Sequence, residues 1–359
     1  MSKFYPLTIA NVRQETRDTI VATFAIPPAL RERFQFIQGQ HLTLRSTIND
    51  EDLRRSYSIC SAVGDEDLRV AIKRTPGGQF STWANDTLKP GVSIEVMPPM
   101  GHFNLPLQAD SARRYLAFAA GSGITPILSI IKTTLAAEPQ SSFTLVYGNR
   151  ASSAVIFREE LAELKDQYRE RLNLVYVMSR EQQDVDLFNG RIDREKCDAL
   201  FERWVDVAAH DAAFVCGPES MMHAVSDALQ AHGMPKEVIK VELFAASIPK
   251  KKAKAESGRP AGASEESEIT VIVDGSHRSF AMGRDKESVL DAGLKQGIDM
   301  RYSCKGGVCA TCRCKVVEGK VEMDANYALE DYEIARGFVL SCQAFPVSER
   351  VVLDFDQDD

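Results

Sequence analysis

The stretch Cys304-Lys305-Gly306-Gly307-Val308-Cys309-Ala310-Thr311-Cys312 is the most specific part of this 359-residue chain. With Cys342 it gives the spacing C-x4-C-x2-C-x29-C, which is the plant-type pattern for a [2Fe–2S] cluster. Two adjacent glycines let the backbone turn tightly and direct N–H groups at cluster sulfurs. A structural zinc site more often has two C-x2-C pairs or a Cys/His mixture, so zinc or unligated thiols are the alternative. We predict that the cluster ligands are Cys304, Cys309, Cys312 and Cys342.

The sequence around these cysteines predicts a small α+β domain of β-grasp type over 269–359. Asp274-Gly275-Ser276-His277 lies between two β-rich runs and indicates a hairpin. From Ser288 to Gln296 the apolar residues have helical spacing, and Gly297 is a suitable stop. Closing strands are expected at 315–319 and 351–355.

A segment without apolar periodicity precedes this domain. Between 246 and 268 lysine, glycine, proline and serine dominate. We expect a flexible linker with a root-mean-square reach of roughly 25 Å. Such a linker would let the cluster domain face an electron donor at one moment and an acceptor at another. A docking role for the lysine run 250–252 is the alternative.

The first two blocks of the chain differ in their hydrophobic pattern. Residues 1–110 contain short β-rich runs separated by turn residues, which predicts an antiparallel β-barrel. In residues 111–245 apolar strands alternate with helical stretches, which predicts an α/β domain with a parallel sheet. The expected strands are Ile20–Ala25, His41–Leu44, Ser56–Ile59, Arg69–Lys73, Tyr115–Ala119, Phe143–Tyr147, Leu172–Val177, Ala213–Cys216 and Val238–Leu243.

Two strand-end turns in the second block predict a nucleotide site. Gly121-Ser122-Gly123-Ile124-Thr125-Pro126 follows a strand and opens a helix, with Thr125 expected as the cap and Pro126 at the first helical position. Free N–H groups at such a helix start suit a pyrophosphate, although proline stands near the third glycine of G-x-G-x-x-G. Cys216-Gly217-Pro218 ends another strand, at the sheet edge where ligands bind in this architecture.

The first block offers a second candidate phosphate site. Arg55-Ser56-Tyr57-Ser58 combines a cation, an aromatic ring that can stack and a hydroxyl that can hydrogen-bond. Gly77-Gly78-Gln79-Phe80-Ser81-Thr82 leads from glycines into a short helix. An ordinary strand and turn is the alternative for each motif taken alone.

Composition narrows the class of protein. A chain with 44% hydrophobic and 26% charged residues is neither disordered nor membrane-resident, and its formal charge of −8 argues against general nucleic-acid binding. The N-terminus lacks the apolar core of a signal peptide, so we expect a cytoplasmic protein without membrane segments. The remaining cysteines are expected to be reduced thiols, with Cys314 packed near the cluster and not a fifth ligand. They are Cys60, Cys197, Cys216 and Cys314.

Taken together and in this order, the motifs at 55–58, 77–82, 121–126 and 216–218 resemble those of the ferredoxin–NADP reductase superfamily. A plant-type ferredoxin at the C-terminus is typical of the reductase components of bacterial oxygenases. The chain is similar, apart from the linker, to reductase subunits of phenylacetyl-CoA 1,2-epoxidase complexes. This closer similarity rests on Gly39–Leu44, Tyr147–Arg150, Lys305–Cys312 and Leu340–Ala344.

The resemblance implies electron transfer from NAD(P)H through a flavin and the cluster to a diiron oxygenase, the phenylacetyl-CoA epoxidase of aerobic phenylacetate degradation. The alternatives are the reductase of a phenol-type monooxygenase or of a ring-hydroxylating dioxygenase, and a redox-sensing module without catalysis. By similarity, Ser58 and Cys216 would be the catalytic residues. The implied cofactor contacts are Arg55, Tyr57, Ser58, Gly78 and Ser81 for the flavin, Gly121, Gly123, Thr125 and Gly217 for the nicotinamide nucleotide, and Phe244 for the second face of the flavin.

The nature of the nucleotides depends on few residues. Arg150, with Ser152 and Ser153, follows the strand expected to reach the adenosine ribose, and no acid stands at 149 or 150 to bind a bare 2′-hydroxyl. We therefore expect NADPH in preference to NADH. FAD is expected in preference to FMN from the resemblance alone.

Overall fold

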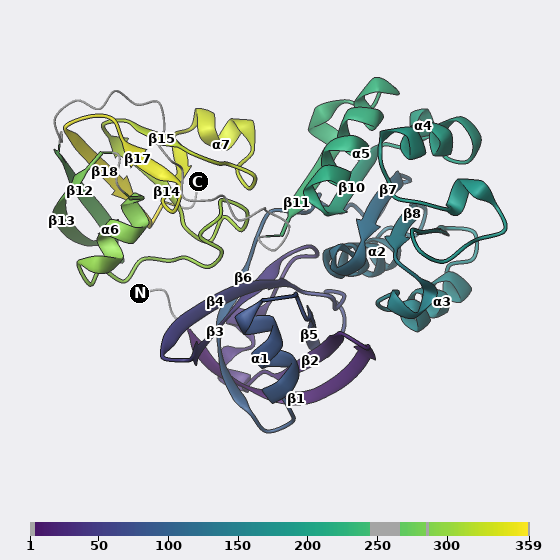
Figure 1. Cartoon of the computed structure of the whole chain (residues 1–359), viewed down its shortest axis with the longest axis horizontal. Coiled ribbons are helices and arrows are strands. Elements are labelled where there is room, and N and C mark those ends of the chain that lie inside the picture. The colour runs from purple at the N-terminus through teal and green to yellow at the C-terminus, as the bar shows by residue number, and fades with distance from the viewer. Residues whose placement is uncertain (1–3, 245–265, 285–286, 358–359) are drawn as a thin grey trace. The chain divides into compact units, whose positions relative to one another are not determined.

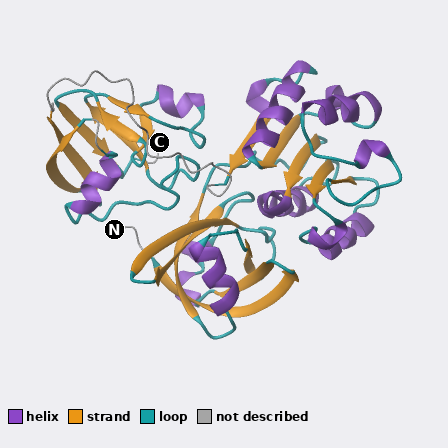
Figure 2. Ribbon diagram, in the orientation of Figure 1, coloured by secondary structure: helices purple, strands orange, loops and turns teal. Residues whose placement is uncertain are grey.

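The structure, a computed structural model, describes residues 4–244, 266–284 and 287–357 (Figures 1 and 2). Contacts divide the chain into two compact units. The first unit holds an antiparallel sheet and a parallel sheet, and the second holds the cysteine-rich sheet. None of the helices among these residues is long and apolar enough to cross a membrane.

The N-terminal sheet closes into a barrel. Its strands are β1 (Tyr5–Thr16), β2 (Thr19–Ala25), β3 (His41–Ile48), β4 (Glu51–Ser58), β5 (Leu68–Lys73) and β6 (Ser93–Met100), in the order β4-β3-β6-β1-β2-β5. An antiparallel bridge between Ile59 and Val70 joins the two ends of this order. Helix α1 (Gln79–Thr87) covers one opening of the barrel and buries Phe80 and Ala84 in its core.

The second sheet is parallel and carries helices on its faces (Figure 2). Its strands are β7 (Arg114–Ala120), β8 (Ser142–Asn149), β9 (Leu172–Met178), β10 (Ala212–Gly217) and β11 (Ile239–Leu243); its helices are α2 (Ile124–Ala137), α3 (Arg158–Gln167), α4 (Arg194–Arg203) and α5 (Glu219–Ala231). The central strands β7 and β10 are almost wholly apolar because both of their faces are covered. In the order β11-β10-β7-β8-β9, strands β8 and β9 are added on one side of β7 and strands β10 and β11 on its other side. This change of side creates a switch point between β7 and β10, where ligands bind in such sheets.

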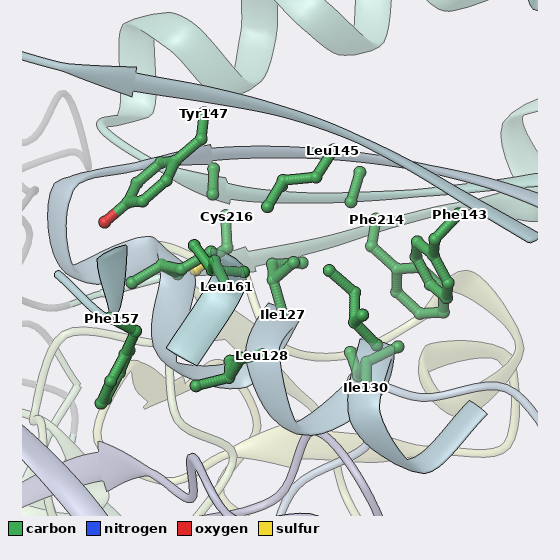
Figure 3. Close-up of a cluster of buried hydrophobic side chains, with 14 of the residues drawn as sticks. Ile127, Leu128, Ile130, Phe143, Leu145, Tyr147, Phe157, Leu161, Phe214 and Cys216 are labelled. Atoms are coloured by element: carbon green, nitrogen blue, oxygen red, sulfur yellow. The ribbon is translucent and has the colours of Figure 1, made fainter. Parts of the chain in front are cut away.

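The barrel and the α/β region share apolar packing. Val21, Cys60, Ala71 and Phe103 of the barrel region belong to the same buried cluster as the core of the parallel sheet, part of which is shown in Figure 3. The segments predicted as separate domains, 1–110 and 111–245, thus carry one sheet each and share part of one buried apolar cluster.

The C-terminal unit contains a mixed five-stranded sheet and a two-stranded sheet. Its elements are β12 (Glu266–Val273), β13 (Ser276–Gly283), α6 (Val289–Lys295), β14 (Arg313–Glu318), β15 (Val321–Met323), α7 (Asp331–Ala335), β16 (Phe338–Leu340), β17 (Ala344–Pro346) and β18 (Arg350–Asp354). The predicted hairpin is present, with a two-residue turn in which Asp274 and Gly275 both have positive φ. The Ser288 hydroxyl accepts a hydrogen bond from the Asp291 N–H (3.2 Å) and caps α6.

One predicted boundary is wrong. The linker 246–268 lies outside the described residues as far as 265, but residues 266–268 belong to β12. Ser267 is buried there, and its hydroxyl donates to the Ser348 carbonyl oxygen (2.7 Å). The residues at the start of this strand are polar because they face solvent or hydrogen-bond to a distant turn. Their composition is therefore similar to that of the linker.

Candidate functional site

The glycine turn after β7 and the cysteine turn after β10 meet at the switch point. A Cβ atom on Gly123 would lie 2.1 Å from the Cys216 carbonyl oxygen, a distance that no side chain tolerates. Gly121 has a φ of +53°, a backbone conformation that favours glycine. The two turns predicted from separate parts of the sequence are thus in direct contact.

The expected helix cap is wrong. A 3-10 turn over Gly121–Gly123 continues directly into α2 at Ile124, so the helix begins before Thr125 and places Pro126 at its third residue. The Thr125 hydroxyl donates to the Ser122 carbonyl oxygen (3.0 Å) and does not cap an N–H group. Proline is tolerated within this first turn because the N–H groups there have no partner inside the helix.

A lysine from the barrel adds positive charge at this turn. The Nζ atom of Lys73, at the end of β5, would lie 3.8 Å from a Cβ atom on Gly121. A cation beside free N–H groups at a helix start strengthens a site for a pyrophosphate. The sequence analysis missed Lys73 because nothing local marks a lysine at a strand end as a neighbour of a distant turn.

A buried tyrosine holds the same turn in place through a hydrogen bond. The Tyr147 hydroxyl, on β8, donates to the Gly121 carbonyl oxygen (2.9 Å). Burial raises the pKa of Tyr147 above its usual value, so the hydroxyl keeps its proton over an even wider pH range than an exposed tyrosine. In Figure 3 its ring lies at one end of the apolar cluster that includes Cys216.

Ser58 and Cys216, predicted to be catalytic, are both neighbours of Glu242. The buried Ser58 hydroxyl donates to the Glu242 side chain (3.1 Å), and Glu242 on β11 pairs with Cys216 on β10. Burial, followed by the charge of Glu242, raises the pKa of Cys216 well above its usual value, so the thiol is neutral. The sequence analysis missed Glu242, since only the strand register shows that it lies beside Cys216.

The motif Arg55–Ser58 lies on strand β4, so its side chains alternate between the two faces of the sheet. On β4, Arg55 and Tyr57 share a partly buried face, while Ser58 points to the opposite side. The Tyr57 ring lies 5.9 Å from the Phe80 ring, centroid to centroid, and is tilted by 37°. Tyr57 therefore has one face backed by α1 and is suited to stacking.

The second predicted phosphate loop is tightly folded before α1. The Ser81 hydroxyl accepts a hydrogen bond from the Thr75 N–H (3.0 Å), and a Cβ atom on Gly78 would lie 2.7 Å from the same hydroxyl oxygen. Ser81 is thus engaged in shaping the loop. The N–H groups at the start of α1 are the donors that remain for a phosphate.

Two arginines follow neighbouring strands beside the predicted adenosine position. Arg150, after β8, is exposed, and its carbonyl oxygen accepts a hydrogen bond from the Arg180 N–H (2.9 Å) after β9. Ser152 donates to Glu181 through its N–H (2.7 Å) and its hydroxyl (2.5 Å), and these hydrogen bonds lower the pKa of Glu181. The backbones of Arg150 and Arg180 are therefore neighbours, and the Ser152 hydroxyl is bound to a carboxylate.

The four predicted ligand cysteines are close together. Cys304 is half-buried and its thiol interacts with those of Cys309 and Cys342, while Cys342 also interacts with Cys312. The Gly306 N–H donates to the Cys304 sulfur (3.3 Å), as expected from the paired glycines. The hydrogen bond with Cys304, and then burial, raise the pKa of Cys309 well above its usual value, so binding of iron must displace protons.

The donor set fits a two-iron cluster. Among the described residues there is no group of three or more His, Cys, Asp or Glu arranged around a single metal ion. A [2Fe–2S] cluster held by four cysteines takes two thiolates at each iron, so neighbouring pairs of thiols are what it requires. Cys314 is buried on β14, where its thiol donates to the Val339 carbonyl oxygen (3.8 Å).

Family models match three successive regions of the chain. Residues 6–105 match an oxidoreductase FAD-binding domain, residues 118–227 an oxidoreductase NAD-binding domain, and residues 271–347 a 2Fe-2S iron–sulfur cluster binding domain. The chain is 48% identical to one of the subunits of the 1,2-phenylacetyl-CoA epoxidase of Escherichia coli, over 99% of each chain. It is 35% identical to the ferredoxin reductase component of 3-ketosteroid-9-alpha-monooxygenase from Rhodococcus rhodochrous, over 97% of this chain and 96% of the relative.

Solved structures show the same fold. Phthalate dioxygenase reductase, 23% identical, matches over 98% of each chain with a TM-score of 0.59. An intact type IV self-sufficient cytochrome P450 monooxygenase, 22% identical, matches 98% of this chain with a TM-score of 0.71, and this chain spans 41% of it.

The chain belongs to the ferredoxin–NADP reductase superfamily, in the form that carries a C-terminal [2Fe–2S] ferredoxin domain. It is an NAD(P)H-dependent flavin/iron–sulfur oxidoreductase whose cofactors are FAD, a nicotinamide nucleotide and a [2Fe–2S] cluster. The predicted fold class, an antiparallel flavin domain, a parallel nucleotide domain and a small ferredoxin domain, is confirmed.

Proposed function

We propose that this chain is the cytoplasmic reductase component of a multicomponent diiron oxygenase, and that this oxygenase is the phenylacetyl-CoA epoxidase of aerobic phenylacetate degradation. The observation that carries the proposal is the 48% identity to a component of the Escherichia coli epoxidase, which runs through all three cofactor regions. The steroid monooxygenase reductase is 35% identical over a similar length. The difference favours the epoxidase over other oxygenase partners.

Within this function we assign a role to each of the side chains described above. FAD converts a two-electron hydride transfer into single-electron transfers to the cluster. The turn Gly121–Gly123, the start of α2 and Lys73 would bind the nicotinamide pyrophosphate. Ser58, Glu242 and Cys216 would line the place where the nicotinamide and flavin rings meet. Arg55, Tyr57, Gly78 and Ser81 would hold FAD, Phe244 would cover its second face, and Cys304, Cys309, Cys312 and Cys342 would hold the iron.

Reconstitution tests the choice of partner. The purified protein is mixed with the epoxidase oxygenase components, a phenol-type monooxygenase or a ring-hydroxylating dioxygenase, each with its own substrate. We expect substrate-dependent NADPH consumption matched by product only with the epoxidase. Equal coupling to another oxygenase would refute the assignment, and failure to reduce ferricyanide or cytochrome c with any partner would favour a redox-sensing module.

We further propose NADPH as the preferred cosubstrate. The support is that Arg150 and Arg180, whose backbones are hydrogen-bonded, follow the neighbouring strands expected to reach the adenosine 2′-phosphate. Replacing either arginine with Ala should raise the KM for NADPH roughly 10-fold or more and leave the KM for NADH nearly unchanged. The reason is that a hydrogen bond to a charged group contributes about 1.5–3 kcal/mol. Steady-state ferricyanide reduction with both nucleotides measures this, with Arg194→Ala as an exposed control in the same unit. Equal changes for both nucleotides would contradict the proposal.

A further inference from the structure

Four alternating charges join the barrel to the helices of the parallel sheet. Arg69 on β5 makes two hydrogen bonds to Glu160 on α3 (2.8 and 3.3 Å). Lys132 on α2 bonds to Glu160 (3.0 Å) and to Asp65 (2.6 Å), which precedes β5. Asp65 also lies 3.8 Å from Arg69, which closes the ring. We call these residues the four-charge cluster.

The four-charge cluster is largely shielded from water. The side chains of Arg69, Lys132 and Glu160 are 17%, 15% and 16% exposed, and that of Asp65 is 30% exposed. Burial acts to raise the pKa of Glu160, but the hydrogen bonds and charges of Arg69 and Lys132 together lower it below its usual value. Charged groups buried in balanced pairs add little net stability, because removing them from water costs about as much as their attraction gains. What such a cluster provides is a defined geometry.

The backbone around the four-charge cluster connects it to both halves of the reaction site. Thr133, next to Lys132, accepts a hydrogen bond from the Val63 N–H through its hydroxyl (3.1 Å). Val63 lies in the loop that follows Ser58, and this loop is closed by the Asp65 side chain, which accepts from the Ala62 N–H (2.9 Å). The loop that contacts α2 is therefore the direct continuation of the chain from the flavin motif at the end of β4.

On the other side of this contact, helix α2 connects the four-charge cluster to the nucleotide turn. Lys132 lies eight residues after Ile124 on α2, about 12 Å along the helix axis at 1.5 Å per residue. Because a helix of this length is rigid, fixing it at Lys132 and Thr133 also fixes the position of its start. The start of α2 is where Gly121–Gly123 meets Cys216.

We propose that the four-charge cluster is a positioning device for hydride transfer: it sets the distance between the nicotinamide and flavin sites without touching either ligand. Loss of the four-charge cluster lowers the rate of the hydride step and leaves nucleotide affinity unchanged. Displacement of reacting groups by about 1 Å costs up to roughly 100-fold in rate. The hydride step comes before electrons reach the [2Fe–2S] cluster. The inference can therefore be tested without knowing the oxygenase partner.

The test replaces the bidentate pair by apolar residues of similar length. In Arg69→Met/Glu160→Met the remaining charges, Lys132 and Asp65, still balance, so the fold should keep its stability. The limiting rate of flavin reduction is measured by anaerobic rapid mixing with NADPH and, separately, with NADH. We expect it to fall roughly 10- to 100-fold, with an unchanged Kd for the nucleotide and a full kinetic isotope effect for nicotinamide deuterated at C4.

The matched control is Arg45→Met/Glu95→Met. That pair is also bidentate (2.8 and 2.7 Å) but joins strands β3 and β6 of the barrel, and its loss should leave the limiting rate unchanged. Lys132→Gln is a second variant that keeps the Arg69–Glu160 pair, and it should lower the rate in the same sense. The inference is overturned if either four-charge-cluster variant, folded and FAD-loaded, reduces flavin at the native limiting rate. It is also overturned if the loss lies in Kd alone.

Discussion

Electron transfer to cluster-dependent acceptors is lost in Cys309→Ser, while reduction of FAD by NADPH continues at the native rate. Cys309 is buried in the ligand loop beside Cys304, so its loss removes one of the four thiolates that a [2Fe–2S] cluster needs. The turns at Gly121–Gly123 and Cys216–Pro218, together with Tyr57 and Ser58, belong to the other compact unit, so we expect the substitution to leave them unchanged. Rapid mixing with NADPH follows the flavin directly, and cytochrome c reduction follows the cluster.

Cys314→Ala is the control for this experiment. Cys314 is two residues from Cys312 and is fully buried, but its thiol hydrogen-bonds to a backbone carbonyl group on β16. The variant should retain two irons per chain and the native rate of cytochrome c reduction. If Cys309→Ser lost flavin reduction as well, the functional separation of the two units would be wrong.

Gly123→Ala has the second large effect. The added Cβ atom would lie 2.1 Å from the Cys216 carbonyl oxygen and 3.0 Å from the Gly217 nitrogen, so the turn after β7 must move away from β10. We expect nicotinamide-dependent flavin reduction to fall about 100-fold, since the reacting groups lose their alignment. Forcing atoms into a packed site also lowers the free energy of unfolding by about 1–3 kcal/mol.

Gly64→Ala provides the comparison. A Cβ atom there meets no other atom within 4 Å, so the same chemical change should alter neither rate nor stability. Rapid-mixing rates and thermal unfolding of both variants are measured with FAD bound. Native flavin reduction by Gly123→Ala would show that the contact between the two turns is not needed for the reaction.

Local sequence patterns predicted most of the fold. The apolar runs of β7, β8 and β10 and the Asp274–Gly275 hairpin could be found because their signals lie within a few neighbouring residues. The cluster ligands could be predicted for the same reason, because three of the four cysteines lie within nine residues. The cap at Thr125 was predicted wrongly because a 3-10 turn and an α-helix share the same sequence signals at their junction.

The rest of the site could not be predicted from local patterns. Glu242 lies 184 positions after Ser58, and Lys73 lies 48 positions before Gly121, so only the folded register brings each pair together. Arg180 is an ordinary charged residue after a strand until its N–H is seen to bond to Arg150. Contacts of this kind depend on which strands become neighbours, and a single sequence contains no local record of that choice.

The apolar packing shared by the barrel and the parallel sheet determines where this protein divides into exchangeable modules. Val21, Cys60, Ala71 and Phe103 would be left facing water if the chain were cut near residue 110, and a barrel expressed alone should aggregate. A fragment of residues 1–244 keeps that packing intact and should be a monodisperse yellow protein. The ferredoxin domain has an apolar core of its own, so we expect that it can be exchanged between reductases as a unit, whereas the flavin and nucleotide regions should be exchangeable only together.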